Sequence, residues 1–105
     1  MATETALLQT QSPYIDRVTI QAQGGNTVTF TNNVAQRFTV IIENANVKFY
    51  TPKDTLFYDI PRGLCAVTPQ LKPIDTEIIY HIYYHDIESD NVFNCDAPPR
   101  IIVHK

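Results

Sequence analysis

The sequence lacks any long apolar stretch and any concentration of positive charge. Its apolar runs, such as residues 40–42 and 101–103, are far shorter than the roughly 20 residues that span a bilayer, so no membrane span is expected. Eight Lys and Arg residues against eleven Asp and Glu residues give a formal net charge of −3. Because nucleic acids are bound through clustered Lys and Arg, these scattered basic residues argue against a nucleic-acid partner.

The first residues lack the features of an export signal. Residues 1–8 contain an acidic residue, no Lys or Arg, and none of the apolar core that a signal peptide carries. If Met1 is the natural start of the chain, a cytoplasmic protein is expected.

Patterns that predict catalysis are also missing. The chain contains three Gly residues, two of them in one turn, so no glycine-rich loop for phosphate is expected. No Ser, Thr or Cys stands at a spacing that predicts contact with a base, as nucleophilic catalysis requires. We therefore expect a protein that is not an enzyme and that carries no cofactor.

Cysteine is scarce, and its two copies leave the redox compartment open. Cys65 and Cys95 are a candidate disulfide pair of the kind found in secreted β-sandwiches. Two reduced thiols are the other interpretation, which the missing export signal favours. The apolar neighbours of Cys65 predict a small core residue, whereas Cys95 lies in a polar loop and is expected to be exposed.

What the sequence does contain is a series of short stretches in which apolar and polar residues alternate. Val18 and Ile20 share one predicted strand face, and Val28 and Phe30 share another after the Gly24-Gly25 turn. These two strands are expected to form a hairpin or near neighbours. No stretch has the periodicity of an amphipathic helix, so parallel βαβ units are excluded and antiparallel pairing is expected.

The spacing of the turns predicts the fold class. A chain of 105 residues suffices for one core. We expect an all-β protein, a single antiparallel Greek-key β-sandwich of about seven strands over residues 14–105. Residues 1–13 show no periodicity and are expected to form a flexible N-terminal arm.

The strongest strand signal covers residues 77–85. Ile78, Tyr80, Ile82 and Tyr84 share one face, and the opposite face carries a second set consisting of Ile79, His81, Tyr83 and His85. If the face with His81, Tyr83 and His85 is uncovered, a protein partner or a second copy of the chain could dock on it. The main functional hypothesis is thus a non-enzymatic interaction or structural module that can self-associate.

Two groups of residues could bind a metal instead. His81 and His85 are four residues apart on a strand, which places them about 13 Å from each other, so they cannot chelate one ion as a pair. Each could still join ligands from a neighbouring strand, such as His104.

The second group lies in the polar loop over residues 86–96. Asp86, Glu88 and Asp90 imitate the start of a calcium loop, although the helix-loop-helix version requires Gly and an acid where Asn91 and Ala97 stand. The alternative functional hypothesis is therefore a metal- or small-ligand-binding protein, with calcium or a sugar at the loop end of the sandwich.

Two segments resemble a known family. Residues 25–33, Gly-Asn-Thr-Val-Thr-Phe-Thr-Asn-Asn, resemble the opening of a cupredoxin strand, and residues 80–85 followed by residues 100–103 resemble the closing strand pair. Cupredoxins are Greek-key sandwiches that bind one copper ion for electron transfer. The resemblance implies the same fold here, over about half of the chain.

The copper ligands of that family do not carry over. Blue copper is bound by two His, one Cys and usually a weak axial Met. The family's first His follows the Asn pair, where this chain has no His in residues 34–38, and the family's Cys follows the penultimate strand, where this chain has Tyr84-His85-Asp86. The only Met is Met1. The resemblance therefore implies a cupredoxin-like fold without copper.

Overall fold

The computed structural model describes residues 2–95 and 97–105, and these residues are almost entirely in β-strands. One short helix, α1, covers Ala45–Lys48. The strands are β1 (Thr3–Leu8), β2 (Thr19–Gln23), β3 (Thr27–Asn32), β4 (Arg37–Ile42), β5 (Leu56–Ile60), β6 (Cys65–Val67), β7 (Thr76–Ile79), β8 (His81–Asp86), β9 (Asn91–Asn94) and β10 (Arg100–His104). The all-β sandwich is confirmed, but with ten strands in place of about seven.

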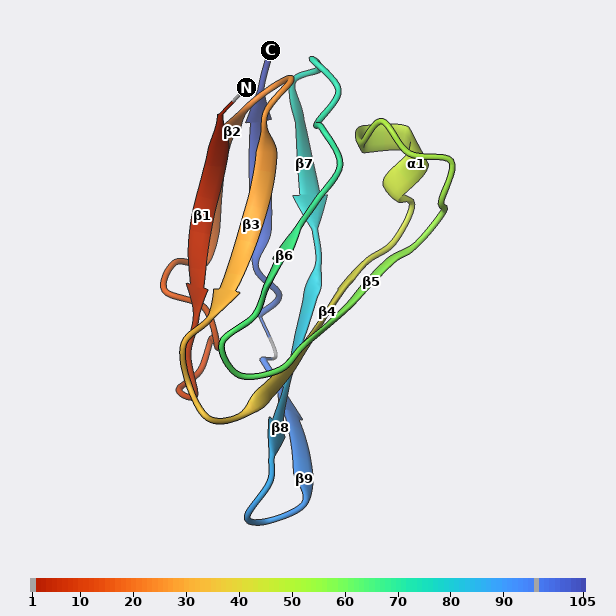
Figure 1. Cartoon of the computed structure of the whole chain (residues 1–105). Helices are drawn as coiled ribbons and strands as arrows, with labels where there is room; N and C mark the ends of the chain where they lie inside the picture. Colours follow the sequence, from red (N-terminus) through yellow and green to blue (C-terminus); the bar gives the residue numbers. More distant parts are fainter. Residues whose placement is uncertain (1, 96) are drawn as a thin grey trace.

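The strands form three sheets that build the two layers of the sandwich. Their strand orders are β1-β3-β6, β2-β10-β7 and β5-β4-β8-β9. The first sheet lies in front of the second in Figure 1, and both chain ends lie at the same end of the molecule. The β8–β9 hairpin extends beyond the sandwich at the opposite end (Figure 1).

The strand predicted over residues 77–85 is divided at Tyr80. Before this residue β7 pairs with β10, and after it β8 pairs with β4. The Tyr80 backbone N–H donates to the carbonyl of Pro99 rather than to a ladder. One continuous alternating pattern therefore supplies strands to two sheets, which raises the strand count.

The N-terminal arm predicted over residues 1–13 is wrong for most of its length. Residues 3–8 form β1, which pairs in parallel with β3 over all six residues. Ala6 and Leu8 point into the core while Leu7 points outward. Only two inward apolar residues mark this strand, too few for its alternation to stand out in the sequence. Met1, the first residue of the predicted arm, lies outside the described residues.

The expectation of purely antiparallel pairing also needs correction. β1 pairs in parallel with β3, and β10 pairs in parallel with β2. β2 and β3 do not form a hairpin, because the Gly24-Gly25 turn leads from one layer to the other. At Gly24 a Cβ atom would lie 2.5 Å from the Cα atom of Pro73, so the close approach of these two backbones requires glycine.

The core is made by inward side chains from both layers. Phe30 on β3 packs against Tyr80, with ring centroids 5.5 Å apart. Phe38, Val40 and Ile42 on β4 are fully buried, as the alternation requires. The expected core position of Cys65 is wrong, because β6 is an edge strand whose central residue, Ala66, faces the core while its neighbours face solvent.

Helices play a minor part in this fold. Among the described residues, no helix has the length and apolar character needed to cross a membrane.

The hydroxyl of Tyr80 is a buried polar group without a hydrogen-bond partner among the described residues. Burying a hydroxyl without a partner costs about 1–3 kcal/mol. We therefore expect Tyr80→Phe to raise the free energy of unfolding by about 1 kcal/mol. Urea denaturation at neutral pH measures this change in the free energy of unfolding. A decrease of more than about 1 kcal/mol in Tyr80→Phe would mean that the hydroxyl makes a stabilising hydrogen bond.

The same hydroxyl makes stability depend on alkaline pH. Burial, reinforced by the charge of Asp16 and opposed by that of Arg17, raises the pKa of Tyr80 well above its ordinary value of about 10. Above about pH 10 the unfolded chain loses this proton while the folded chain keeps it, so folding stability falls as the pH rises. Tyr80→Phe is expected to make that fall shallower in denaturation curves recorded between neutral and alkaline pH.

Candidate ligand pocket at the hairpin end

The outer face of the β5-β4-β8-β9 sheet carries the residues that the sequence singled out. On β8, His81, Tyr83 and His85 face outward and are half-buried. Their neighbours across the sheet are, in order, Ile41, Thr39 and Arg37 on β4. The side chains of His85 and Thr39 are hydrogen-bonded through Nε2 and Oγ1 at 2.8 Å.

A pocket of about 500 Å³ lies at the hairpin end of this face. We call it the hairpin pocket. It is formed by the β3–β4 and β5–β6 loops, the ends of β4 and β8, and the β8–β9 turn. Its polar lining residues are Gln36, Arg37, Arg62, His85, Asp86, Asp90 and Asn91.

One buried residue positions the loop on the β4 side of the pocket. Asn32, at the end of β3, is fully buried. Its amide nitrogen donates to the carbonyls of Gln36 (2.6 Å) and Ile60 (2.9 Å), and its amide oxygen accepts from the N–H of Val34 (3.0 Å). The Gln36 side chain in turn accepts from the N–H of Ile87 at 3.0 Å, which joins this loop to the hairpin.

The predicted calcium residues form the turn of the hairpin. Asp86 accepts from the Glu88 N–H at 3.1 Å and from the Ser89 hydroxyl at 2.9 Å. Asp90 has a φ of 58°, a left-handed conformation that Asp adopts more readily than most residues. The turn thus accounts for the alternating oxygen side chains, and only Asp86 and Asp90 line the hairpin pocket. Calcium binding stays a prediction.

A smaller hollow of about 320 Å³ lies at the opposite end of the same face. His81, Glu43, Glu77 and Lys48 line it. The Lys48 ammonium is bonded to the Thr76 hydroxyl and to the Glu77 carbonyl. The two histidines predicted as separate candidates therefore belong to separate hollows, with Tyr83 between them along the strand.

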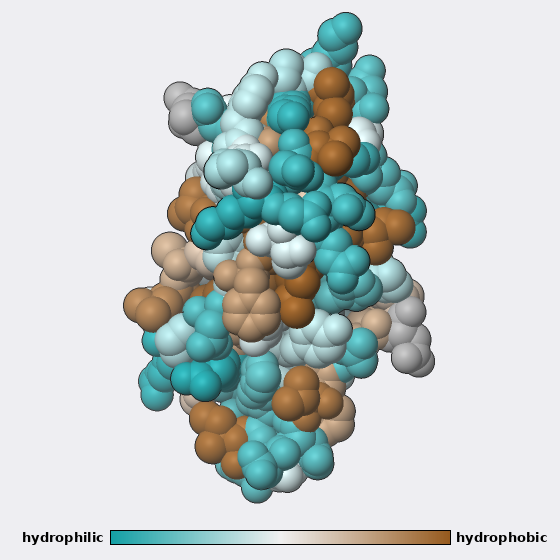
Figure 2. All heavy atoms as spheres, turned by 90° about the vertical axis from the view of Figure 1, so that its right-hand side faces the viewer, coloured by the Kyte–Doolittle hydropathy of each residue, from teal (hydrophilic) through white to brown (hydrophobic). Residues whose placement is uncertain are grey.

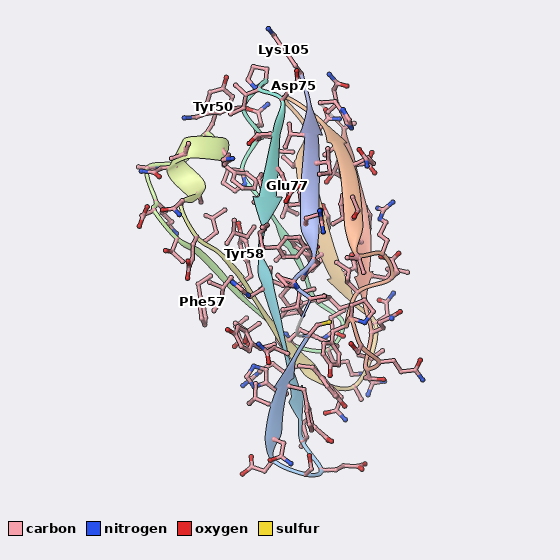
Figure 3. All side chains as sticks on the ribbon, turned by 180° about the vertical axis from the view of Figure 1, so that it is seen from behind. Tyr50, Phe57, Tyr58, Asp75, Glu77 and Lys105 are labelled. Atoms are coloured by element: carbon pink, nitrogen blue, oxygen red, sulfur yellow. The ribbon has the colours of Figure 1, made fainter. Side chains whose placement is uncertain are left out.

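Figure 2 shows a face of the molecule on which apolar residues form small patches separated by hydrophilic ones. Phe57, on the edge strand β5, is 64% exposed and points away from the sandwich in Figure 3, where Tyr58 is labelled beside it. Two polar contacts connect β10 and the residue after it to the β7 region. The Asp75 carboxylate accepts from the backbone N–H of Lys105 at 2.7 Å. Glu77 forms an exposed ion pair with Arg100 at 3.5 Å.

The remaining candidate residues that the structure describes do not line the hairpin pocket. Both thiols are free: Cys65 is exposed on β6, and Cys95 is half-buried and accepts from the Ser12 hydroxyl at 3.4 Å. His104, at the end of β10, is bonded to the side chain of Gln21. Asp96, the end of the predicted polar loop, lies outside the described residues.

The pocket residues Gln36, Arg37 and Arg62 were not among the candidates predicted from the sequence. Gln36 and Arg62 lie in two loops and Arg37 begins β4, and all three lie beside the hairpin only after β4 pairs with β5 and β8. No local spacing marks these residues, so only a correct prediction of the strand pairing would have found them.

No protein-family model matches the sequence, and no curated protein matches it either. Solved structures do match. An amicyanin variant determined with Cu(I) is 14% identical, with a TM-score of 0.63 over 97% of this chain and 82% of that chain. A second amicyanin variant, in its reduced Cu(I) form, is 12% identical, with a TM-score of 0.64 over 99% and 84% of the two chains. A reduced auracyanin from Roseiflexus castenholzii is 15% identical, with a TM-score of 0.55 over 100% and 98%.

The chain has a cupredoxin-like fold. This agrees with the resemblance found in the sequence, and the structural match covers nearly the whole chain rather than half of it. At identities of 12–15%, it is the structural superposition that establishes the fold.

The main functional hypothesis is wrong by this comparison. The structures that share the cupredoxin-like fold include copper-bound proteins, which favours the alternative of metal or small-ligand binding over a non-enzymatic interaction or structural module. Nothing in the comparisons supports a homo-oligomer.

The described residues of this cupredoxin-like fold do not fit a blue copper ion. No group of three or more His, Cys, Asp or Glu side chains among them is arranged to bind a metal. His85 pairs with Val92 on the outer face of the sheet, and Cys95 lies three residues further along. Blue copper needs two His and one Cys around a single ion, and the described residues do not bring such a set together.

Proposed function

We propose that this protein binds a small molecule in the hairpin pocket. The observation that carries the proposal is the pocket itself, about 500 Å³ at the loop end of the sandwich, where polar side chains from two loops and a hairpin converge. Small-molecule sites have volumes of roughly 300–1,000 Å³ and use a few placed polar groups to orient the ligand.

The donor geometry favours a small molecule over a metal ion. His85, Asp86 and Asp90 line the same pocket, but His85 is bonded to Thr39 and both oxygens of Asp86 accept bonds within the turn. A metal would compete with those bonds for His85 Nε2 and for the Asp86 oxygens. Among the described residues that line the pocket there is no Phe, Tyr or Trp ring, so a stacked sugar is less well supported than a small charged or polar molecule. The proposal keeps the expectation that the protein is not an enzyme.

Filling the pocket tests the proposal. Ala35 is exposed and lines the pocket, so Ala35→Trp should occupy the space without disturbing the core. In a thermal-shift screen of a library of polar metabolites, we expect compounds that raise the Tm of the original chain to lose that effect in this variant. The loss of affinity should be at least about tenfold.

The matched control is Ala2→Trp, which adds the same ring at an exposed residue outside the pocket. Compounds should bind this variant as they bind the original chain. A library without any stabilising compound, or compounds that bind Ala35→Trp unchanged, would refute the proposed function.

A further inference from the structure

The charges of the hairpin pocket are separated by sign. In the strand order β5-β4-β8-β9, Arg62 follows β5 and Arg37 begins β4, whereas Asp86 ends β8 and Asp90 lies in the turn before β9. The basic side chains therefore come from one side of the pocket and the acidic side chains from the other. Two positive and two negative formal charges leave the lining without a net charge, apart from His85.

Two of these four charges already have partners within the protein. Arg37 forms an ion pair with Asp59, with 3.3 Å between Nε and Oδ1. Asp86 accepts two hydrogen bonds inside the turn. Within residues 2–95 and 97–105, the side chains of Arg62 and Asp90 make neither a hydrogen bond nor an ion pair, so one free charge of each sign remains at the pocket.

The pocket also offers apolar surface. Ile87 and Val92 line it and are 68% and 56% exposed, more than most apolar residues of the chain. An apolar group of a ligand could cover both side chains and remove their surface from water, which is favourable.

We infer that the ligand is a small zwitterion of the amino-acid type, with an apolar side chain. Its carboxylate is bound by Arg62 and its ammonium group by Asp90, while its side chain contacts Ile87 and Val92. A ligand with only one charge would satisfy one side of the pocket and be repelled by the other, so the arrangement selects against it. This inference depends on the proposed small-molecule function.

Three probes of matched shape test the inference by isothermal titration of the whole chain. L-leucine carries both charges, 4-methylpentanoate only the carboxylate, and 3-methylbutylamine only the ammonium group. We expect leucine to bind at least about tenfold more tightly than either singly charged probe, since a charge-assisted hydrogen bond is lost in each.

Two variants should change the relative affinities for the two singly charged probes in opposite directions. Arg62→Gln should lower the affinity for leucine about tenfold and raise the affinity for 3-methylbutylamine, because it removes the positive charge that repels the ammonium group. Asp90→Asn should lower the affinity for leucine about tenfold and raise the affinity for 4-methylpentanoate. Damage to the fold would weaken all three probes together. Lys53→Gln and Asp54→Asn remove the same charges at exposed residues outside the pocket and should change none of them.

The outcomes separate the inference from the function on which it depends. If library compounds bind in the pocket but leucine does not, or if a singly charged probe binds as tightly as leucine, the zwitterion is wrong and the small-molecule function stands. If neither leucine nor any library compound binds, both are wrong.

Discussion

Replacing Asn32 with Ala is expected to lower the free energy of unfolding by about 3–5 kcal/mol. The side chain is fully buried and makes three hydrogen bonds, two to backbone carbonyls and one from a backbone N–H. Removing it leaves the carbonyls of Gln36 and Ile60 and the N–H of Val34 without this partner. Each buried group left unpaired costs about 1–3 kcal/mol.

The neighbouring residue supplies the control for this prediction. Asn33 is exposed, so Asn33→Ala should change stability by less than about 0.5 kcal/mol. Asn32→Asp keeps the shape and the acceptor oxygen but loses both donors, so it should be at least as damaging as Asn32→Ala. Urea denaturation of the three variants measures these differences. Equal costs for Asn32→Ala and Asn33→Ala would mean that the bonds of Asn32 do not stabilise the loop.

The loss of the Asn32 side chain should also weaken ligand binding in the hairpin pocket. Its bonds position residues 33–36, and Gln36 joins that loop to the hairpin. A variant that still folds should therefore bind library compounds more weakly than the original chain, measured at a temperature where both are folded.

Leu8→Ala is expected to cost about 2–4 kcal/mol of folding stability. Leu8 is 3% exposed and lies at the end of β1, where it packs in the core. Truncating a buried leucine removes apolar contacts and leaves a cavity. A flexible arm would predict almost no cost, so this variant distinguishes a paired strand from an arm.

Leu7 provides a matched comparison on the same strand. It is 44% exposed and faces away from the core, so Leu7→Ala should cost less than about 1 kcal/mol. Chemical denaturation of both variants gives the comparison directly. Similar small costs for Leu7→Ala and Leu8→Ala would contradict the docking of β1 on β3.

Local sequence patterns predict this fold well where strand alternation is strong. On the segment over residues 77–85, the inward position of Ile78, Tyr80 and Ile82 follows from period-two alternation and is confirmed by their burial. β9 escaped prediction because Val92 and Phe93 are 56% and 40% exposed in a short strand with no alternation of burial. Its pairing with β8 places Phe93 beside Tyr84, with ring centroids 6.0 Å apart.

The pocket was predictable only in part. His85, Asp86 and Asp90 stood out because chemistry-bearing residues cluster in a short segment. Arg37 and Arg62 come from elsewhere in the chain, and their place beside the hairpin depends on the pairing of β4 with β5 and β8. Non-local pairing of this kind is not encoded in any single window of sequence.

The most direct test of the central claim, that a small molecule binds in the hairpin pocket, is an amide chemical-shift map of the protein recorded by NMR during titration with L-leucine and with the best library compound. We predict saturable shifts concentrated in the pocket residues that carry an amide proton, residues 35–37, 62, 85–87 and 90–92. Shifts confined to another part of the molecule, or none at any ligand concentration that saturates a thermal-shift response, would contradict the account.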